Sequence, residues 1–118
     1  MNDITFLDCT LRDGGYYTDW DFNLDKTKKL LEGLNESGVN VIELGYKAPY
    51  SNGKYYGLFR NCNEDYLNFI SKNDQAEYAF MIDVKEFVNE TSVNHAILDK
   101  YIKDADNSVF SWVRLASY

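Results

Sequence analysis

The stretch that decides the fold is Asp8-Cys9-Thr10-Leu11-Arg12-Asp13-Gly14-Gly15, close to the amino terminus of a chain of 118 residues. It follows β-favouring residues that predict a first strand over residues 4–8. The pair Gly14-Gly15 predicts a sharp turn, because glycine readily adopts positive φ. Between strand and turn, Arg12 and Asp13 place a guanidinium beside a carboxylate. A carboxylate can bind a hard divalent cation and a guanidinium can stabilise an oxyanion, so this strand end is the candidate reaction centre.

The rest of the chain alternates between helices and strands. Apolar residues at helical spacing predict a helix over residues 23–37, with Asn23 as its N-cap and Gly38 as its stop. The near-continuous apolar run that follows is typical of a parallel strand buried on both faces. We expect further elements in this order: a polar and aromatic loop over 9–22, a strand over 39–45, a loop over 46–62 with a turn at Asn52-Gly53, a helix over 63–72, a strand over 77–83, a helix over 92–103 and a strand over 109–116. Strand and helix in alternation predict an α/β fold with a parallel sheet.

Composition excludes several classes of protein. The chain is 45% hydrophobic and 26% charged, with 12 basic and 19 acidic residues and a formal net charge of −7. No basic stripe is visible, so we expect neither nucleic acid nor an anionic membrane as a partner. Cys9 and Cys62 form no Cys-x-x-Cys pair, which argues against a zinc module. No apolar run approaches the ~18 residues of a membrane span, and residues 1–3 resemble no secretory signal, so a cytoplasmic location is expected.

The stretch from Asp8 to Gly15 resembles the signature of the metal-dependent TIM-barrel lyases and aldolases. That family includes hydroxymethylglutaryl-CoA lyase, 4-hydroxy-2-oxovalerate aldolase and isopropylmalate synthase. The synthases typically continue with Glu-Gln, whereas this chain continues with Gly15-Tyr16, closer to the aldolase branch. The resemblance implies a (β/α)8 barrel of roughly 250 residues. Residues 1–118, with about four βα units and parallel strands, would form the first half of one catalytic domain.

The same resemblance implies a divalent-metal-dependent aldolase or lyase that cleaves or forms a C–C bond next to a 2-oxo acid through a metal-bound enolate. Mg²⁺ or Mn²⁺ would be the cofactor, Asp13 a metal ligand and Arg12 the group that stabilises the enolate. Glu43 interrupts the apolar second strand, where a buried charge is costly unless paired or linked to a metal. It could be an edge carboxylate at a strand end, but the resemblance implies a catalytic residue near the metal or the substrate. Tyr16 stands where 4-hydroxy-2-oxovalerate aldolases usually have a histidine, and it could pass a proton, bind the substrate hydroxyl or form an aromatic wall. The expected substrate contacts are Arg12, Gly14 and Arg114.

Other candidate residues have plainer interpretations. His95 is the single histidine and is expected to be a solvated residue in the middle of a helix. Cys9 has no histidine base nearby, so we expect a small buried residue rather than a nucleophile. The His-x-His pair of the family's metal site is not in this sequence. The aromatic residues of the loop over 46–62 could form either a lid or packing: Tyr50, Tyr55, Tyr56 and Phe59.

Three interpretations of the length stay open. The chain could be the first half of a longer enzyme whose second half supplies the His-x-His ligands, which we favour. It could be a short protein that pairs with another half barrel, including a second copy of itself. It could also be a small doubly wound domain without the activity. Two alternative functions remain, an acyl-CoA/2-oxo acid condensing synthase of the isopropylmalate synthase type and an inactive interaction module. We expect little activity from the 118 residues alone.

Overall fold

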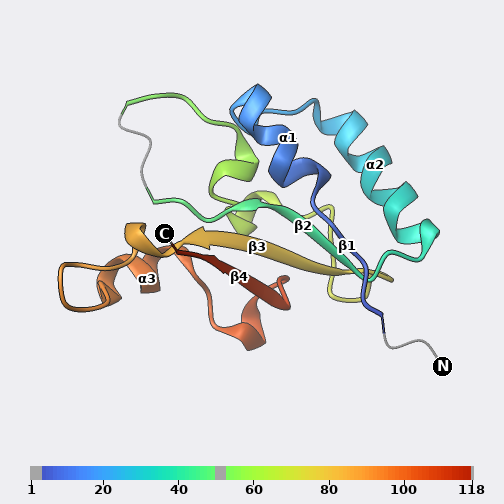
Figure 1. The fold of residues 1–118 in the computed structure, drawn as a ribbon. Helices are drawn as coiled ribbons and strands as arrows, with labels where there is room; N and C mark the ends of the chain where they lie inside the picture. The colour runs from blue at the N-terminus through green and yellow to red at the C-terminus, as the bar shows by residue number, and fades with distance from the viewer. Residues whose placement is uncertain (1–3, 50–52, 118) are drawn as a thin grey trace.

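A computed structural model describes residues 4–49 and 53–117. Within these residues the strands form one parallel sheet of four strands in sequence order. This is the α/β architecture that the sequence predicts, and its strand order is that of half a (β/α)8 barrel. Figure 1 shows the first two helices together over one face of the sheet. The elements are β1 (Leu7–Asp8), α1 (Thr10–Thr18), α2 (Leu24–Ser37), β2 (Val41–Tyr46), β3 (Glu77–Asp83), α3 (His95–Tyr101) and β4 (Trp112–Ala116).

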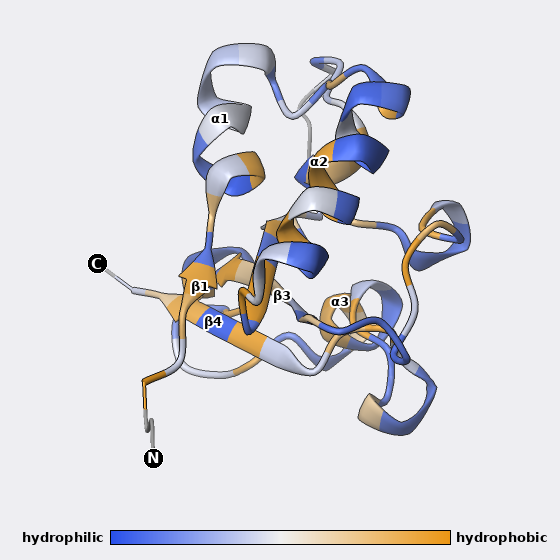
Figure 2. Ribbon diagram, turned by 90° about the vertical axis from the view of Figure 1, so that its right-hand side faces the viewer, coloured by the Kyte–Doolittle hydropathy of each residue, from blue (hydrophilic) through white to orange (hydrophobic). Residues whose placement is uncertain are grey.

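The core lies around β2 and β3. All six residues of β2 are buried, as are the middle five of the seven in β3, whereas β1 and β4 form the edges and β4 is largely exposed. The strands are largely orange in Figure 2, while much of α2 is blue. This is the arrangement expected of strands buried on both faces next to a helix with one solvated side. None of the helices in the described part of the chain is long and apolar enough to cross a membrane.

Helix α2 confirms its sequence signals. The side chain of Asn23 accepts a hydrogen bond from the Lys26 backbone N–H, as an N-cap should. Gly38 follows the last turn with φ of 89°, the left-handed conformation that favours glycine at this position. Thr27 and Leu31 are buried against the sheet. Local capping and periodicity were therefore sufficient to place this helix.

The prediction for the motif itself was wrong in one respect, because Thr10–Thr18 form helix α1 instead of a loop. Gly14 and Gly15 lie inside that helix, and the left-handed residues are Asp19 and Trp20, with φ of 54° and 57°. Gly15 serves a different purpose, since a Cβ there would lie 1.9 Å from Cδ1 of the Trp20 ring. The glycine thus lets the indole fold back onto α1, and the chain turns five residues later than expected, at Asp19 and Trp20.

The expected helix over residues 63–72 is also wrong, and only one turn of 3-10 helix forms, over Glu64–Tyr66. The buried carboxylate of Glu64 is bound from three directions, by Lys47 Nζ at 3.0 Å, Ser108 Oγ at 2.9 Å and the Val109 backbone N–H at 2.7 Å. Burial alone would raise the pKa of Glu64, but the hydrogen bonds from Val109 and Lys47 lower it. These long-range contacts, with Leu67 and Ile70 in the core, replace the helical hydrogen bonds.

The third strand, Glu77–Asp83, has the expected bounds, and the second strand is shifted by one or two residues to Val41–Tyr46. The first strand, the last helix and the fourth strand are shorter than expected. The first strand covers only Leu7–Asp8 of residues 4–8, α3 begins at His95 and ends at Tyr101, and the fourth strand begins at Trp112. His95 is exposed, as expected of a solvated residue, although it is the first residue of α3 and not a central one. In the expected loop, Phe59 is buried and Tyr55 is 71% exposed. Tyr50 lies outside the described ranges, as does Asn52, the first residue of the predicted turn at Asn52-Gly53.

Replacing Gly15 and Gly14 by alanine should give opposite results. Gly15→Ala forces a methyl group into the Trp20 ring and should lower the free energy of unfolding by about 1–3 kcal/mol. Gly14→Ala places its Cβ 3.6 Å from the Phe22 ring, an ordinary contact, and gains helix propensity, so stability should stay level or rise by up to ~1 kcal/mol. Urea unfolding of both variants measures the difference, and equal loss in both would contradict this account of α1.

The buried Lys47–Glu64 ion pair should contribute more to stability than an exposed pair of the same length. Lys47→Ala leaves the carboxylate of Glu64 buried without its cation, and we expect a loss of about 3 kcal/mol. Lys54→Ala is the matched control, because Lys54 pairs with Asp19 at the same 3.0 Å distance but is 56% exposed. Its unfolding midpoint should hardly change. Similar unfolding midpoints for the two variants would mean that Glu64 does not organise the segment over residues 63–72.

Candidate active site

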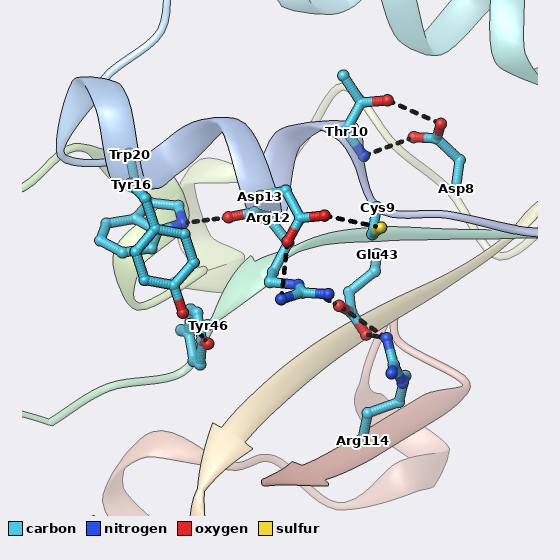
Figure 3. Close-up of polar contacts among 10 residues, drawn as sticks. All are labelled: Asp8, Cys9, Thr10, Arg12, Asp13, Tyr16, Trp20, Glu43, Tyr46 and Arg114. Atoms are coloured by element: carbon cyan, nitrogen blue, oxygen red, sulfur yellow. Dashed lines mark hydrogen bonds and ion pairs between the residues drawn. The ribbon is translucent and has the colours of Figure 1, made fainter.

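Four charged side chains meet where α1 follows β1 (Figure 3). Arg12 and Asp13 come from the first turn of α1, Glu43 from the middle of β2 and Arg114 from the middle of β4. Nε of Arg12 donates to Oε1 of Glu43 at 2.8 Å, and Nη1 of Arg114 lies 3.1 Å and 2.9 Å from the two oxygens of the same carboxylate. The structure thus brings together Arg12, Asp13, Glu43 and Arg114, which the sequence predicted from separate segments.

Glu43 is the buried centre of this cluster. Its side chain is 0% exposed, against 17% for Arg12 and 41% for Arg114. The register between β2 and β3 shifts between Glu43 and Gly45, an irregularity of the kind that often redirects side chains near functional sites. A buried carboxylate needs partners, and two guanidinium groups supply them. Glu43 therefore orients both arginines and is itself closed off from solvent.

The guanidinium of Arg12 makes two charged contacts at once. Besides Glu43, its Nη1 lies 2.8 Å from Oδ1 of Asp13. Burial alone would lower the pKa of Arg12, but the hydrogen bond and charge of Glu43 raise it above its usual value. The group therefore stays cationic, and its Nη2 takes part in neither contact. Such a fixed cation can stabilise negative charge that develops on a substrate oxygen.

Asp13 is the accessible carboxylate of the cluster. Its side chain is 58% exposed, and its Oδ2 accepts a hydrogen bond from the Cys9 thiol at 3.3 Å. Burial and the hydrogen bond to Asp13 raise the pKa of Cys9, so the thiol is neutral near pH 7. Cys9 is half-buried, whereas the sequence predicted a buried residue. In the ranges 4–49 and 53–117, no three His, Cys, Asp or Glu side chains gather to hold a metal ion. Asp13 can therefore supply one oxygen ligand, as in Mg²⁺ sites completed by water and substrate, but not a complete protein cage.

The aromatic end of α1 lies one helical turn from Arg12. The hydroxyl groups of Tyr16 and Tyr46 are 2.6 Å apart, and Trp20 Nε1 donates to the Arg12 backbone carbonyl at 3.0 Å. Figure 3 shows the three rings together beside α1. Tyr16 is 60% exposed and Tyr46 only 6%. The exposed side chain of Tyr16 and its hydrogen bond to Tyr46 are compatible with both expected roles, an aromatic wall and a contact to a substrate hydroxyl.

Sequence reasoning missed Tyr46 and Trp20 as parts of this site. Tyr46 is the last residue of β2, and carboxyl ends of parallel strands are where active-site residues gather. The position of Tyr46 at the end of its strand could therefore have identified it as a site residue. Gly14, an expected substrate contact, lies on α1 next to Asp13 and takes part in none of the contacts described above.

Comparison with known proteins gives one informative match. No protein-family model matches the chain, and no curated protein matches it. Among solved structures, a match described as the "N-terminal domain of a putative aldolase from Bacteroides vulgatus" has a TM-score of 0.65 and 27% sequence identity. The alignment covers 95% of this chain and 35% of that chain, so this chain spans about a third of the neighbour's length. The similarity supports an aldolase-like α/β fold.

Removing the negative charge of Glu43 should destabilise the fold far more than removing that of Asp13. Glu43→Gln keeps the side-chain shape but leaves two neighbouring guanidinium groups without their buried counter-charge, and we expect a loss of about 3 kcal/mol. Asp13→Asn removes a carboxylate that is 58% exposed, so the loss should stay below about 1 kcal/mol. Urea unfolding at pH 7 makes the comparison. A Glu43→Gln variant as stable as the parent would show that the carboxylate does not hold the arginines.

Proposed function

We propose that this chain is the amino-terminal part of a TIM-barrel aldolase that cleaves or forms a C–C bond next to a 2-oxo acid, with Mg²⁺ or Mn²⁺ as its cofactor. The observation that carries the proposal is the pair of arginines held on one buried carboxylate beside an exposed aspartate. Resemblance of the Asp8–Gly15 stretch to the lyase and aldolase signature supports it. The aldolase-like structural neighbour supports it as well.

The two arginines would divide the recognition of the substrate. Arg114 is 41% exposed and can bind the carboxylate of a 2-oxo acid, since guanidinium groups match carboxylates in shape and charge. Arg12, fixed by Glu43 and Asp13, can donate to the oxygen on which negative charge develops. A preoriented donor of this kind typically raises the rate of the chemical step by a factor of about 10²–10³. Glu43 positions both groups and does not touch substrate.

Cleavage of a 4-hydroxy-2-oxo acid requires that the 4-hydroxyl lose its proton while the bond between C3 and C4 breaks. The electron pair of that bond passes to the enolate of the 2-oxo acid, an aldehyde leaves, and the enolate then takes up a proton. A divalent cation at Asp13 would polarise the 2-oxo carbonyl group. The Tyr16 hydroxyl, hydrogen-bonded to Tyr46 and in a side chain that is 60% exposed, would bind the substrate hydroxyl and exchange its proton with water.

Further parts of the enzyme belong to the proposal. Because the chain spans about a third of its structural neighbour, the other strands of a barrel and the other metal ligands would come from a longer natural form or from another half barrel. The proposal therefore assigns to this chain one metal ligand, two substrate-binding arginines and Tyr16.

Pyruvate release from 4-hydroxy-2-oxo acids by the longest natural form, measured with and without EDTA, tests the proposal. EDTA should abolish the activity, and Asp13→Asn should reduce it by about 10²-fold or more and remove the response to added Mg²⁺ or Mn²⁺. Asp65→Asn is the matched control, because Asp65 is 77% exposed and should leave the rate unchanged.

Two results would reject the proposal in different ways. Full activity in EDTA would remove the metal from the mechanism. Thiol release from acetyl-CoA with a 2-oxo acid acceptor, without cleavage of 4-hydroxy-2-oxo acids, would instead favour a condensing synthase.

A further inference from the structure

A small cavity of about 210 Å³ lies at the carboxyl ends of β2 and β3, next to the aromatic end of α1. Its walls include Tyr16, Trp20, Tyr46, Arg60, Asp83 and Glu86. Of these residues, only Tyr16 is a site residue predicted from the sequence. The cavity shares Tyr16 with the candidate active site, and Trp20 is hydrogen-bonded to the backbone of Arg12. With a volume of about seven water molecules, it has room for a short carbon chain.

Arg60 brings a cation to this cavity, but its charge is enclosed. The guanidinium lies 5.2–5.3 Å from the ring centres of Trp20, Tyr46 and Tyr56, at the distances of cation–π contacts. Its Nη2 pairs with Oε1 of Glu86 at 3.4 Å, and both side chains are only 19% exposed. Aromatic faces and one carboxylate thus surround the positive charge.

The other charges around the cavity also cancel. Lys85 pairs with Asp83 at 3.4 Å, so the two cations, Arg60 and Lys85, are matched by the two carboxylates, Asp83 and Glu86. A phosphate or carboxylate entering the cavity would find both cations already paired, so it would gain little attraction to offset the loss of its hydration. An uncharged chain with hydroxyl groups meets a better match, since phenol hydroxyls and carboxylates can bind its hydroxyls while the rings contact its carbon atoms.

The place of the cavity relative to the arginines gives it a role. Arg12 and Tyr16 are four residues apart on α1, so they lie on the same face about one turn, ~5.4 Å, from each other. A substrate with its 2-oxo acid end at Arg12 and Arg114 and its hydroxyl at Tyr16 would extend past Tyr16 into the cavity. That direction is the one in which the aldehyde portion of an aldol substrate lies.

We propose that this cavity is the subsite for the aldehyde portion of the substrate, and that Glu86, by neutralising Arg60, makes it select an uncharged hydroxyaldehyde over an anionic one. The inference rests on the proposed function, because that function places the 2-oxo acid at the arginines. Glu86 is a specificity-determining residue in this assignment. Its removal exposes the charge of Arg60 to the cavity and should admit an anionic group.

The two tryptophans of the chain provide a local readout. Trp20 lines the cavity, whereas Trp112 lies on the edge strand β4, is 43% exposed and does not line it. Their indole N–H groups give two separate signals in a ¹⁵N-labelled sample of the chain. We would titrate glycerol and glycerol 3-phosphate, unreactive probes with the same carbon chain, at constant ionic strength. Glycerol should shift the Trp20 signal and leave Trp112 unchanged, and the phosphate ester should bind about fivefold more weakly.

Glu86→Gln should reverse this order, with glycerol 3-phosphate binding about tenfold more tightly than in the parent chain and glycerol about equally. Glu90→Gln is the matched control, because Glu90 is exposed on the same connecting segment and does not line the cavity. It should keep the order of the parent. The comparison of the two probes in the parent chain needs no variant, so it remains decisive even where Glu86→Gln fails to fold.

Three outcomes would overturn the assignment: tighter binding of the phosphate ester in the parent, an unchanged order in folded Glu86→Gln, or no Trp20 shift with either probe. These outcomes are distinct from failure of the proposed function. Selective glycerol binding without pyruvate release by the longest natural form would reject the aldolase and leave a subsite for hydroxylated chains. Pyruvate release without the Trp20 shift would reject only the subsite.

Discussion

The ion cluster around Glu43 is the constraint on which the rest of the structure depends. A carboxylate with no exposed surface in the middle of a buried strand would be prohibitively costly alone. Its partners are Arg12, 31 residues before it, and Arg114, 71 residues after it. The cluster forms only when β1, β2 and β4 take their places in one parallel sheet. The sheet and the candidate reaction centre therefore form together. The sheet fixes the positions of these charged side chains although they lie far apart in the sequence.

Elements with local signals could be predicted from the sequence. Helix α2 has Asn23 as a capping acceptor and Gly38 as a left-handed stop, and both act as their residue types suggest. Strand β2 is apolar along most of its length, and Glu43 was recognisable as a candidate site residue because it is the charged residue within that run. A polar residue inside a buried strand has few structural explanations, so it indicated a charged partner before any partner was known.

Elements decided by side-chain packing or by distant contacts could not be predicted in this way. The motif forms α1, and its Gly15 leaves room for the Trp20 ring, a contact between a helix and the turn after it that no local propensity describes. The 63–72 segment has helical periodicity, but Glu64 is bound by Lys47, Ser108 and Val109, and the last two lie more than 40 residues away. The cavity was missed for the same reason, since Tyr46, Arg60 and Glu86 come from three separate elements and form no motif.

Helix α1 connects the two halves of the site. Its first turn holds Arg12 and Asp13, its middle presents Tyr16, and the indole that closes its end returns a hydrogen bond to the carbonyl of Arg12. A shift of the aromatic end would therefore strain the backbone at the arginine, and a shift of the arginine would disturb the ring that covers Arg60. The Tyr16–Tyr46 pair spans the boundary between the charged cluster and the neutral cavity. Under the proposed function, Tyr16 would take the place of the histidine that 4-hydroxy-2-oxovalerate aldolases usually have at this position, with its hydroxyl held by Tyr46 where both regions meet.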